Sequence, residues 1–294
     1  MPAEPLLKPH LIQIPPSKQT LEKIIRLALR EDLGGGDLTS QAIIPEKRVY
    51  TGTILAKESG IIAGLQVADL CFRTVDSKIK FQGKIPEGSP VSWGTVLAEI
   101  RGPARSILSA ERVALNFVQR MSGIASLTRQ FVRAVEGTSA IILDTRKTAP
   151  GLRILDKWAV LLGGGKNHRY GLFDMILIKE NHIAVAGGVR EAVKRVSKWQ
   201  QQGFAVEVEV RQLAELQEAL QLPVDRILLD NMTIDEMKQA VNMAAGKIPL
   251  EASGNINLQN VAEVAHTGVD FISIGTLTHS PKALDISLLL AGTK

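Results

Sequence analysis

SAIILDTRK (139–147) begins a stretch of the chain in which short, β-branched apolar runs repeatedly end in polar or glycine residues. The runs that follow it are DMILIKENH (174–182), VEVEV (206–210), RILLDNM (226–232), PLEASGN (249–255) and FISIGTLTHS (271–280). Buried runs of this length, separated by segments long enough for a helix, are typical of consecutive β/α units. In a barrel of such units, side chains at the carboxyl ends of the strands surround the active site. The stretch therefore predicts an α/β barrel whose chemistry lies at one mouth.

The first half of the chain has a different pattern. TLEKIIRLALR (20–30) places its apolar residues on one side of a helix, which the glycines of EDLGGGDLTS (31–40) should end with a loop. Between residues 48 and 102, short apolar runs alternate with turns, which predicts a small antiparallel sheet with a helix near ADLCFRTV (68–75). A long helix is expected to begin at a cap on Ser109 and to join the two halves.

The two ends of the chain also carry predictions. PKALDISLLL (281–290) predicts a final helix, whose docking site the residues themselves leave open. The first 19 residues contain five prolines and are expected to form a loose arm. No segment approaches the roughly 18 apolar residues that cross a bilayer, so we expect no membrane partner.

Composition favours a globular protein of two domains in a reducing compartment. The 294 residues are 45% hydrophobic, enough for one large core or two modest ones. The single cysteine, Cys71, cannot form an intrachain disulfide, and no Cys and His residues at metal-ligand spacing accompany it. We therefore expect a cytoplasmic protein.

The net charge of +5 fits a small anionic substrate better than a nucleic acid. Lysines and arginines are spread along the chain, aromatic residues make up only 4%, and no RNA- or DNA-binding motif is present. GGGKN (163–167) is not a P-loop, because asparagine follows its lysine, and there is no GxGxxG fingerprint for a dinucleotide cofactor. We interpret GGGKN as a mobile loop that presents His168 and Arg169.

Basic residues follow two of the predicted strands. A guanidinium such as that of Arg146 grips a carboxylate through two parallel hydrogen bonds, whereas the ammonium of Lys147 is suited to phosphate. Lys179 is a candidate carboxylate anchor or Schiff-base lysine, or else a strand-end charge in water. Each residue alone is also compatible with an ordinary surface loop. Their recurrence at several strand ends favours an anion-binding site.

Acidic residues end the next two strands. Glu209 and Asp230 suit a hydrated Mg²⁺ ion, which one or two carboxylates hold together with substrate phosphates, or they pair structurally with nearby basic residues. Glu207 shares a face with Glu209 by the two-residue period of a strand. The sequence therefore leaves open which of these two glutamates approaches the mouth, or whether both do.

The last two strands end in small residues. Glycine lets backbone N–H groups approach an anion, and loops after the last strands of such barrels often hold phosphate. Plain turn chemistry is the alternative. Arg112 differs from these residues, because it lies on the connecting helix; it either reaches a mouth in a neighbouring subunit or is an exposed helical arginine. The candidate phosphate residues are Ser253, Gly254, Asn255, Gly275 and Thr276.

Ten motifs follow one another along the chain: EDLGGGDLTS, GIIAGL, ERVALNFVQRMSGIAS, DTRKTAPGLR, GGGKNHRYGL, IKENHI, VEVEV, LLDNM, EASGNI and ISIGTLTHS. Through these motifs the chain resembles the quinolinate phosphoribosyltransferase family from about Thr20 to Leu290. The resemblance implies an α/β fold: an N-terminal α+β domain (1–115) with an antiparallel sheet, then an open, irregular α/β barrel of TIM-like type (116–280). It further implies that the C-terminal helix (281–294) returns to the first domain, and that the protein is a homodimer.

The resemblance also implies residue roles. Arg112 would enter the partner subunit's site. Quinolinate would bind to Arg112, Thr145, Arg146, His168, Arg169 and Lys179. Phosphoribosyl pyrophosphate would bind to Lys147, Glu209, Asp230, Ser253, Gly254, Asn255, Gly275 and Thr276. Of these, Lys147, Glu209 and Asp230 would be catalytic, and Glu209 and Asp230 would hold Mg²⁺, directly or through water.

We expect an electrostatic mechanism without a covalent enzyme nucleophile. Three other interpretations are open. One is the related phosphoribosyltransferase-like protein of molybdate transport systems, which the full set of basic residues argues against. Another is a Schiff-base enzyme that uses Lys179. The last, a biotinyl- or lipoyl-like carrier in GSPVSWGTVLAEIRG (88–102), lacks a lysine for modification, because none occurs between Lys84 and Lys147.

Overall fold

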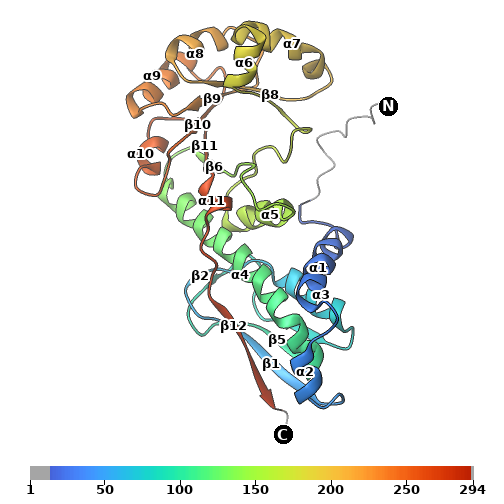
Figure 1. Ribbon diagram of the computed structural model, residues 1–294. Coiled ribbons are helices and arrows are strands. Elements are labelled where there is room, and N and C mark those ends of the chain that lie inside the picture. The colour runs from blue at the N-terminus through green and yellow to red at the C-terminus, as the bar shows by residue number, and fades with distance from the viewer. Residues whose placement is uncertain (1–13, 293–294) are drawn as a thin grey trace, which may run out of the picture. The chain divides into compact units, whose positions relative to one another are not determined.

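The computed structural model describes residues 14–292, which form two compact units (Figure 1). One unit contains Gln130–Lys147 and Gly165–Thr276. The other contains the described residues up to Arg129, Thr148–Gly164 and the described residues from Leu277 on. Residues 1–13 of the proline-rich arm lie outside the described residues, so its looseness stays a prediction.

Six parallel strands form the sheet of the first unit. Each strand lies within one of the six apolar runs, as the sequence predicted. The sheet has the order β6-β11-β10-β9-β8-β7, with β6 and β7 at its two edges, so it is an open relative of a closed barrel. The strands are β6 (Ile141–Leu143), β7 (Ile176–Ile178), β8 (Val206–Val210), β9 (Arg226–Asp230), β10 (Leu250–Ser253) and β11 (Phe271–Ser273).

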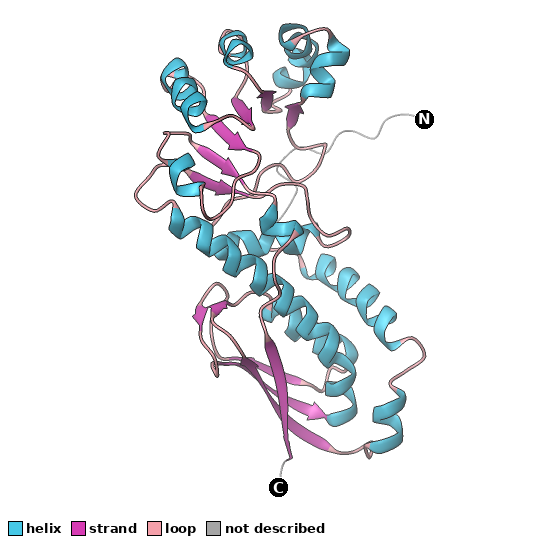
Figure 2. Cartoon of the chain, turned by 60° about the vertical axis from the view of Figure 1, so that its left-hand side comes forward, coloured by secondary structure: helices cyan, strands magenta, loops and turns pink. Residues whose placement is uncertain are grey.

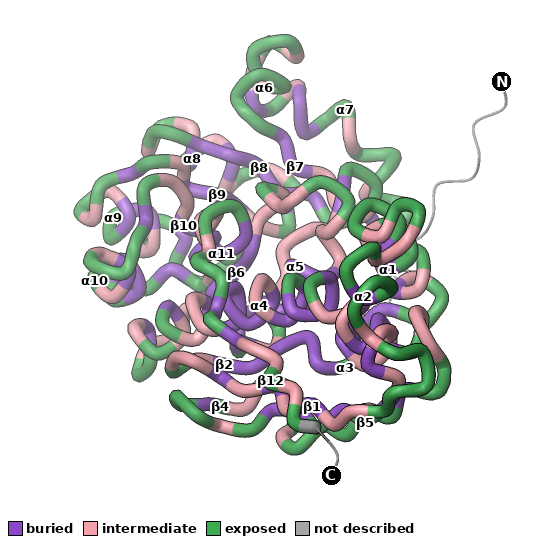
Figure 3. The backbone as a smooth tube through the Cα atoms, turned by 60° about the horizontal axis from the view of Figure 1, so that its bottom comes forward, coloured by how far each residue is buried: buried purple, intermediate pink, exposed green. Residues whose placement is uncertain are grey.

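Helices cover one face of this sheet, as Figure 2 shows. All five residues of β8 are buried, the three valines and both glutamates alike (Figure 3). Thr233 and Glu236 form a capping box at the start of α9, which satisfies two backbone N–H groups. The helices of this unit are α6 (Glu180–Ala186), α7 (Val189–Gln201), α8 (Leu213–Ala219), α9 (Ile234–Ala244) and α10 (Val261–Ala265).

The second unit contains the predicted antiparallel sheet, in the order β12-β1-β5-β3. Its strands are β1 (Val49–Ala56), β3 (Lys80–Gly83), β5 (Val96–Pro103) and β12 (Ile286–Gly292), and β2 (Gly60–Ile61) pairs separately with β4 (Pro90–Val91). Its helices are α1 (Lys18–Leu33), α2 (Leu38–Ile43), α3 (Leu65–Val75), α5 (Arg153–Gly163) and most of α4 (Ala104–Ala134); α11 (Thr276–His279) begins at the boundary. None of the helices described has the length and apolar character to cross a membrane.

The long helix α4 begins at Ala104, directly after β5, so the predicted start at Ser109 is wrong. Ala104 and Ile107 are buried and extend the apolar stripe of the helix toward the strand. The Ser109 hydroxyl does not cap the helix; it donates to Asp37 Oδ2 at 3.1 Å. Asp37 itself caps α2 by accepting from the backbone N–H of Ser40.

The predicted C-terminal helix is also wrong, because Ile286–Gly292 form the strand β12. It pairs antiparallel with β1 over seven residues, from Ala56 opposite Ile286 to Tyr50 opposite Gly292. Gln119 Nε2 donates to the Ile286 carbonyl at 2.8 Å and fixes the start of the strand. A leucine-rich run has good helix propensity, but the free edge of β1 provides a full set of hydrogen bonds, and this tertiary context decides.

A close packing point fixes the segment before β12. A Cβ on Gly123 of α4 would lie 2.1 Å from the backbone oxygen of Lys282. We expect Gly123→Ala to lower the free energy of unfolding by about 1–3 kcal/mol, because the backbone must shift to admit the methyl group. Gly83→Ala in β3 is the matched control, since a Cβ there would have nothing within 4 Å. Urea unfolding checks both variants; equal midpoints would contradict the close contact.

Candidate active site

Most predicted site residues of the first unit lie at or just after the ends of parallel strands, whereas His168 and Arg169 lie in the segment between α5 and β7. Because the carboxyl ends of parallel strands meet at one edge, these residues gather at one mouth. Thr145–Lys147 follow β6, Lys179 follows β7, and Glu209 lies in β8. Asp230 ends β9, Ser253–Asn255 close β10, and Gly275 and Thr276 follow β11.

A cluster of cations lies on one side of this mouth. The Arg169 guanidinium is half-buried, and its Nη1 donates to the Met175 carbonyl at 3.1 Å. Burial, and next the positive charge of Arg146, lower the pKa of Arg169 from its usual value. Two guanidinium groups close enough to repel are stabilised by a bound anion, and their planar geometry suits carboxylates.

The imidazole of His168 connects this cluster to two buried glutamates. His168 Nε2 lies 2.9 Å from Glu207 Oε2 and 3.5 Å from Glu251 Oε2. Its Nδ1 accepts a hydrogen bond of 2.7 Å from the Arg169 backbone N–H. Both glutamate side chains are fully buried. The question left open for Glu207 and Glu209 is thereby answered: both approach the site, Glu207 beside His168 and Glu209 two residues nearer the carboxyl end.

The two buried glutamates hold their protons more tightly than free carboxyl groups. Burial raises the pKa of Glu207 to about 7, against the opposing charge of Arg226. Burial and the adjacent Glu207 charge raise the pKa of Glu251 to about 7. Two carboxyl groups in contact in a dry site share protons as a pair. Arg226 Nη1, 2.8 Å from Glu251 Oε2, supplies the nearest fixed positive charge.

Asp144, which follows β6 and is buried, holds the segment before Arg169. Its Oδ2 accepts from Asn167 Nδ2 at 2.6 Å and its Oδ1 from the His168 backbone N–H at 2.9 Å. Lys166 also forms a parallel bridge with Leu143 of β6. GGGKN is therefore attached to the sheet: Gly163 ends α5, Gly164 caps that helix in the left-handed conformation, and Lys166 joins the strand.

Ion pairs connect the acidic strand ends with neighbouring basic residues. Lys179 Nζ lies 3.2 Å from Glu209 Oε2, and the lysine side chain is half exposed. Arg211 Nε lies 3.2 Å from Asp230 Oδ2, and Arg211 Nη1 lies 2.6 Å from Glu180. The structural pairing considered for these carboxylates is thus present.

Backbone turns at the ends of β9 and β10 form a compact, polar corner. Asn231, Gly254 and Asn255 all have positive φ angles. A Cβ on Gly254 would lie 2.2 Å from Asn231 Oδ1, so only glycine fits this turn. Asn255 Nδ2 donates to Asn231 Oδ1 at 3.0 Å. The corner presents backbone groups and amides, which are suitable partners for a phosphate.

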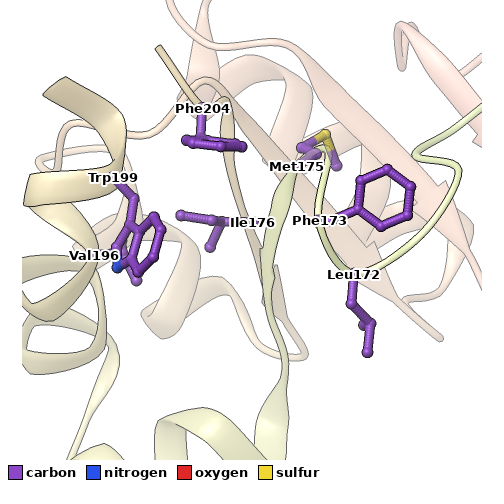
Figure 4. A pocket seen from close by; sticks show the side chains of 7 residues that line it. All are labelled: Leu172, Phe173, Met175, Ile176, Val196, Trp199 and Phe204. Carbon is purple, nitrogen blue, oxygen red and sulfur yellow. The ribbon is translucent and has the colours of Figure 1, made fainter. Parts of the chain in front are cut away.

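Two further features remain, one in the second unit and one in the first. Arg112 is exposed on α4, in the second unit. An apolar pocket lies beside β7, where Ile176, Trp199 and Phe204 face one another (Figure 4). Its lining includes no charged side chain, so it offers nothing to a diacid or a phosphate.

Sequence reasoning did not assign Asp144, Arg211, Arg226 or Glu251 to the site. A signal for two of them is present: Glu251 stands inside the apolar run PLEAS, and Asp144 directly ends IILD. An acidic residue within a buried strand is rare unless it is paired. Nothing in the sequence indicates that Arg211 and Arg226 reach across to neighbouring strands.

A cation-lined mouth at the carboxyl ends of parallel strands defines an α/β enzyme that binds anionic substrates. Two family models match the chain: quinolinate phosphoribosyl transferase, N-terminal domain, over residues 37–122, and the C-terminal domain of the same family over residues 124–289. The chain therefore belongs to the quinolinate phosphoribosyl transferase family.

Relatives and solved structures agree with this family. The chain is 48% identical over 295 residues to the chloroplastic nicotinate-nucleotide pyrophosphorylase [carboxylating] of Arabidopsis thaliana, covering 93% of this chain and 84% of that one. It is 42% identical over 268 residues to a probable nicotinate-nucleotide pyrophosphorylase [carboxylating] of Bacillus subtilis, covering 91% and 92%. The crystal structure of NadC from Streptococcus pyogenes superposes with a TM-score of 0.91 at 39% identity, covering 95% and 99%.

The buried carboxyl pair predicts a pH dependence of stability. In the unfolded chain the Glu251 carboxyl ionises near 4.5, whereas in the folded chain it holds its proton up to about 7. The unfolded state binds fewer protons between these values, so the free energy of unfolding should fall as pH rises from about 4.5 to about 7. Glu251→Gln should flatten this fall, and exposed Glu263→Gln should not. Urea unfolding across this pH range tests the expectation; parallel curves for wild type and Glu251→Gln would contradict it.

Proposed function

We propose that the chain transfers the phosphoribosyl group of phosphoribosyl pyrophosphate to quinolinate and releases CO₂, which gives nicotinate mononucleotide and pyrophosphate in NAD biosynthesis. Membership of the family supports the reaction. The structural observation that carries it is the half-buried Arg169 guanidinium beside Arg146, a cation pair suited to a dicarboxylate.

For the diacid, we propose contacts from two sides of the mouth. Arg146 and Arg169 would grip a carboxylate through parallel N–H donors, and Lys179 would supply a point charge. Thr145 supports this arrangement, because its Oγ1 accepts from the Lys147 backbone N–H at 3.1 Å and shapes the turn after β6. His168 lies between this cluster and the buried glutamates.

For phosphoribosyl pyrophosphate, we propose binding at the neighbouring strand ends. Lys147 is exposed after β6 and would neutralise the departing pyrophosphate. The turn of Ser253, Gly254 and Asn255, with Gly275 and Thr276, would hold the 5-phosphate through backbone and hydroxyl groups. The close approach at Gly254 supports this role, because a larger residue would fill the turn.

Glu209 and Asp230 fit a Mg²⁺ ion. Both are oxygen donors at the ends of adjacent strands, and Mg²⁺ is commonly held by one or two carboxylates together with substrate phosphates. Their present partners, Lys179 and Arg211, are side chains that can move to the substrate's anionic groups. When bound, the ion would supply positive charge to the pyrophosphate oxygens.

The residues would act by position and charge. The diacid cluster would hold the pyridine nitrogen in line with C1 of the ribose, and Lys147 would stabilise charge on the leaving pyrophosphate. Bond formation makes the pyridine nitrogen positive. That charge stabilises the carbanion left when the adjacent carboxylate departs as CO₂, and the carbanion then takes a proton from water to give the C–H bond of the product. The cluster must not stabilise the departing carboxylate too strongly, because equal binding of ground and transition states does not raise turnover.

Arg146→Ala tests the diacid role. We expect its kcat/KM for quinolinate to fall at least about 100-fold, because one guanidinium and its paired hydrogen bonds are lost. The exposed helical variant Arg190→Ala is the matched control. The assay supplies Mg²⁺, quinolinate and phosphoribosyl pyrophosphate and follows CO₂ and nicotinate mononucleotide together. Near-normal efficiency in Arg146→Ala would remove the residue from this role, and failure of wild type to form either product would refute the proposed reaction.

We also propose a homodimer in which Arg112 of one subunit completes the site of the other. Its exposure on α4 is compatible with this role. Mixing Arg112→Ala with Arg146→Ala, each inactive alone, should restore about a quarter of wild-type activity. Half of the dimers would be mixed, and each mixed dimer would hold one intact site. No recovery after confirmed subunit exchange would contradict the shared site.

A cytoplasmic location is part of the proposal. Cys71 is buried and forms no disulfide bond. Burial raises the pKa of its thiol to about 12, so Cys71 is an inert structural residue. Chains without disulfides are typical of reducing compartments. The name of the Arabidopsis relative describes that protein as chloroplastic. A fluorescent fusion of this chain that localises to an organelle would refute the cytoplasmic location.

A further inference from the structure

We propose that Glu207 and Glu251 are positioning residues for the diacid site: they fix the imidazole of His168 and, through it, the backbone of Arg169. The inference rests on the proposed function, because it assumes that Arg169 binds the diacid. It concerns a layer of buried charge beneath the mouth, to which the predicted roles assign nothing.

The two glutamates come from strands that are not neighbours. Glu207 lies in β8 and Glu251 in β10, with β9 between them in the sheet order. Both contact the same ring nitrogen, at 2.9 and 3.5 Å. The imidazole is therefore held from two directions by rigid strands, which position a side chain more accurately than loops do.

Both ring nitrogens of His168 are occupied by protein groups. Nδ1 accepts from the Arg169 backbone N–H, so this nitrogen carries no hydrogen. Nε2 then carries the hydrogen and donates it to Glu207. This arrangement sets one tautomer and one ring orientation. It also makes the His168 side chain a direct connection between Glu207 and the backbone of Arg169.

Arg226 supplies the positive charge of this layer. Its Nη1 pairs with Glu251 at 2.8 Å, and its guanidinium carbon lies 4.1 Å from the centroid of the Phe271 ring. In register, Arg226 stands opposite Glu207 across the β8–β9 ladder. A cation held by both a carboxylate and an aromatic face is fixed in place, and it in turn fixes Glu251.

A hydrogen-bonded layer explains the cluster better than a metal ion. Ligand-type atoms of His168, Glu207 and Glu251 all lie within 4.8 Å of one another, a spacing that a metal could use. However, Glu251 already has a cation partner in Arg226, and His168 Nε2 is at hydrogen-bond distance from Glu207. Positive charge is thus supplied without an ion.

Position matters here because Arg169 has few other constraints. Its Nη1 contact with the Met175 carbonyl fixes the end of the side chain, and its backbone N–H donates to His168 Nδ1. Asp144 holds only the preceding residue, through the His168 backbone N–H. Misplacing a binding group by about 1 Å can reduce catalysis by about 100-fold. The buried layer would therefore act on diacid binding and leave the phosphoribosyl side unchanged.

Steady-state kinetics of Glu207→Gln and Glu251→Gln test the proposal. We expect the KM for quinolinate to rise about 10- to 100-fold, the range typical for residues that orient a ligand from behind, with less than a twofold change in the KM for phosphoribosyl pyrophosphate. Exposed Glu263→Gln is the matched control and should equal wild type. Unchanged quinolinate KM in folded variants, or equal increases for both substrates, would overturn the proposal.

A measurement on the wild-type protein keeps the proposal open to refutation if both variants fail to fold. ¹⁵N spectra of histidine-labelled enzyme, with His168 assigned by comparison with His168→Ala, should show a protonated Nε2 and an unprotonated, hydrogen-bonded Nδ1. The opposite tautomer, or rapid averaging between the two, would overturn the fixed orientation. A stoichiometric divalent metal in the purified wild type that is lost in Glu251→Gln would overturn it in favour of a metal site.

Arg169→Lys separates this proposal from the proposed function. If Arg169→Lys leaves the quinolinate KM unchanged, the diacid site itself is wrongly assigned. If Arg169→Lys raises that KM and Glu207→Gln and Glu251→Gln do not, the diacid site stands and the positioning role is refuted.

Discussion

Buried carboxyl groups beneath a cluster of cations are the constraint on which the site depends. Asp144, Glu207 and Glu251 are carboxyl groups with no access to solvent, and each contacts the Asn167–Arg169 segment or its neighbours. Removing a carboxylate from water is unfavourable unless hydrogen bonds and opposite charges compensate. The compensation is shared among His168, Arg226 and backbone N–H groups, so none of these contacts is independent of the others.

The same sheet explains why residues distant in sequence act together. Chain-consecutive strands β7 to β11 lie side by side, and β6 closes the order next to β11. Side chains two residues apart on a strand share a face, so Glu207 and Glu209 form successive levels, as do Glu251 and Ser253. The lower level is dry and carries the fixed charges. The upper level is less buried, with Glu209 at 8% exposure and Ser253 of intermediate exposure.

The residues that sequence reasoning located correctly are those whose position follows from local pattern. The six apolar runs of the barrel have the period and length of buried strands, and the polar residue after each run follows from that. The start of α4 and the form of Ile286–Gly292 were wrong, because both depend on partners elsewhere: Asp37 for Ser109, and the edge of β1 for β12. Arg226 was missed for a similar reason, since its contact with Glu251 crosses between strands. Local secondary-structure propensity contains no information about contacts between residues that are distant in sequence.

The pairing of β12 with β1 has a consequence for the order in which the chain folds. The antiparallel sheet needs residues from about position 50 and from Ile286–Gly292, with the barrel strands between them in sequence. During synthesis β1 must keep an open edge until Ile286–Gly292 leave the ribosome, by which time every described strand of the barrel is already available. Contacts of such long sequence separation form slowly. The sheet that contains β1 is therefore the last of the described sheets to be completed.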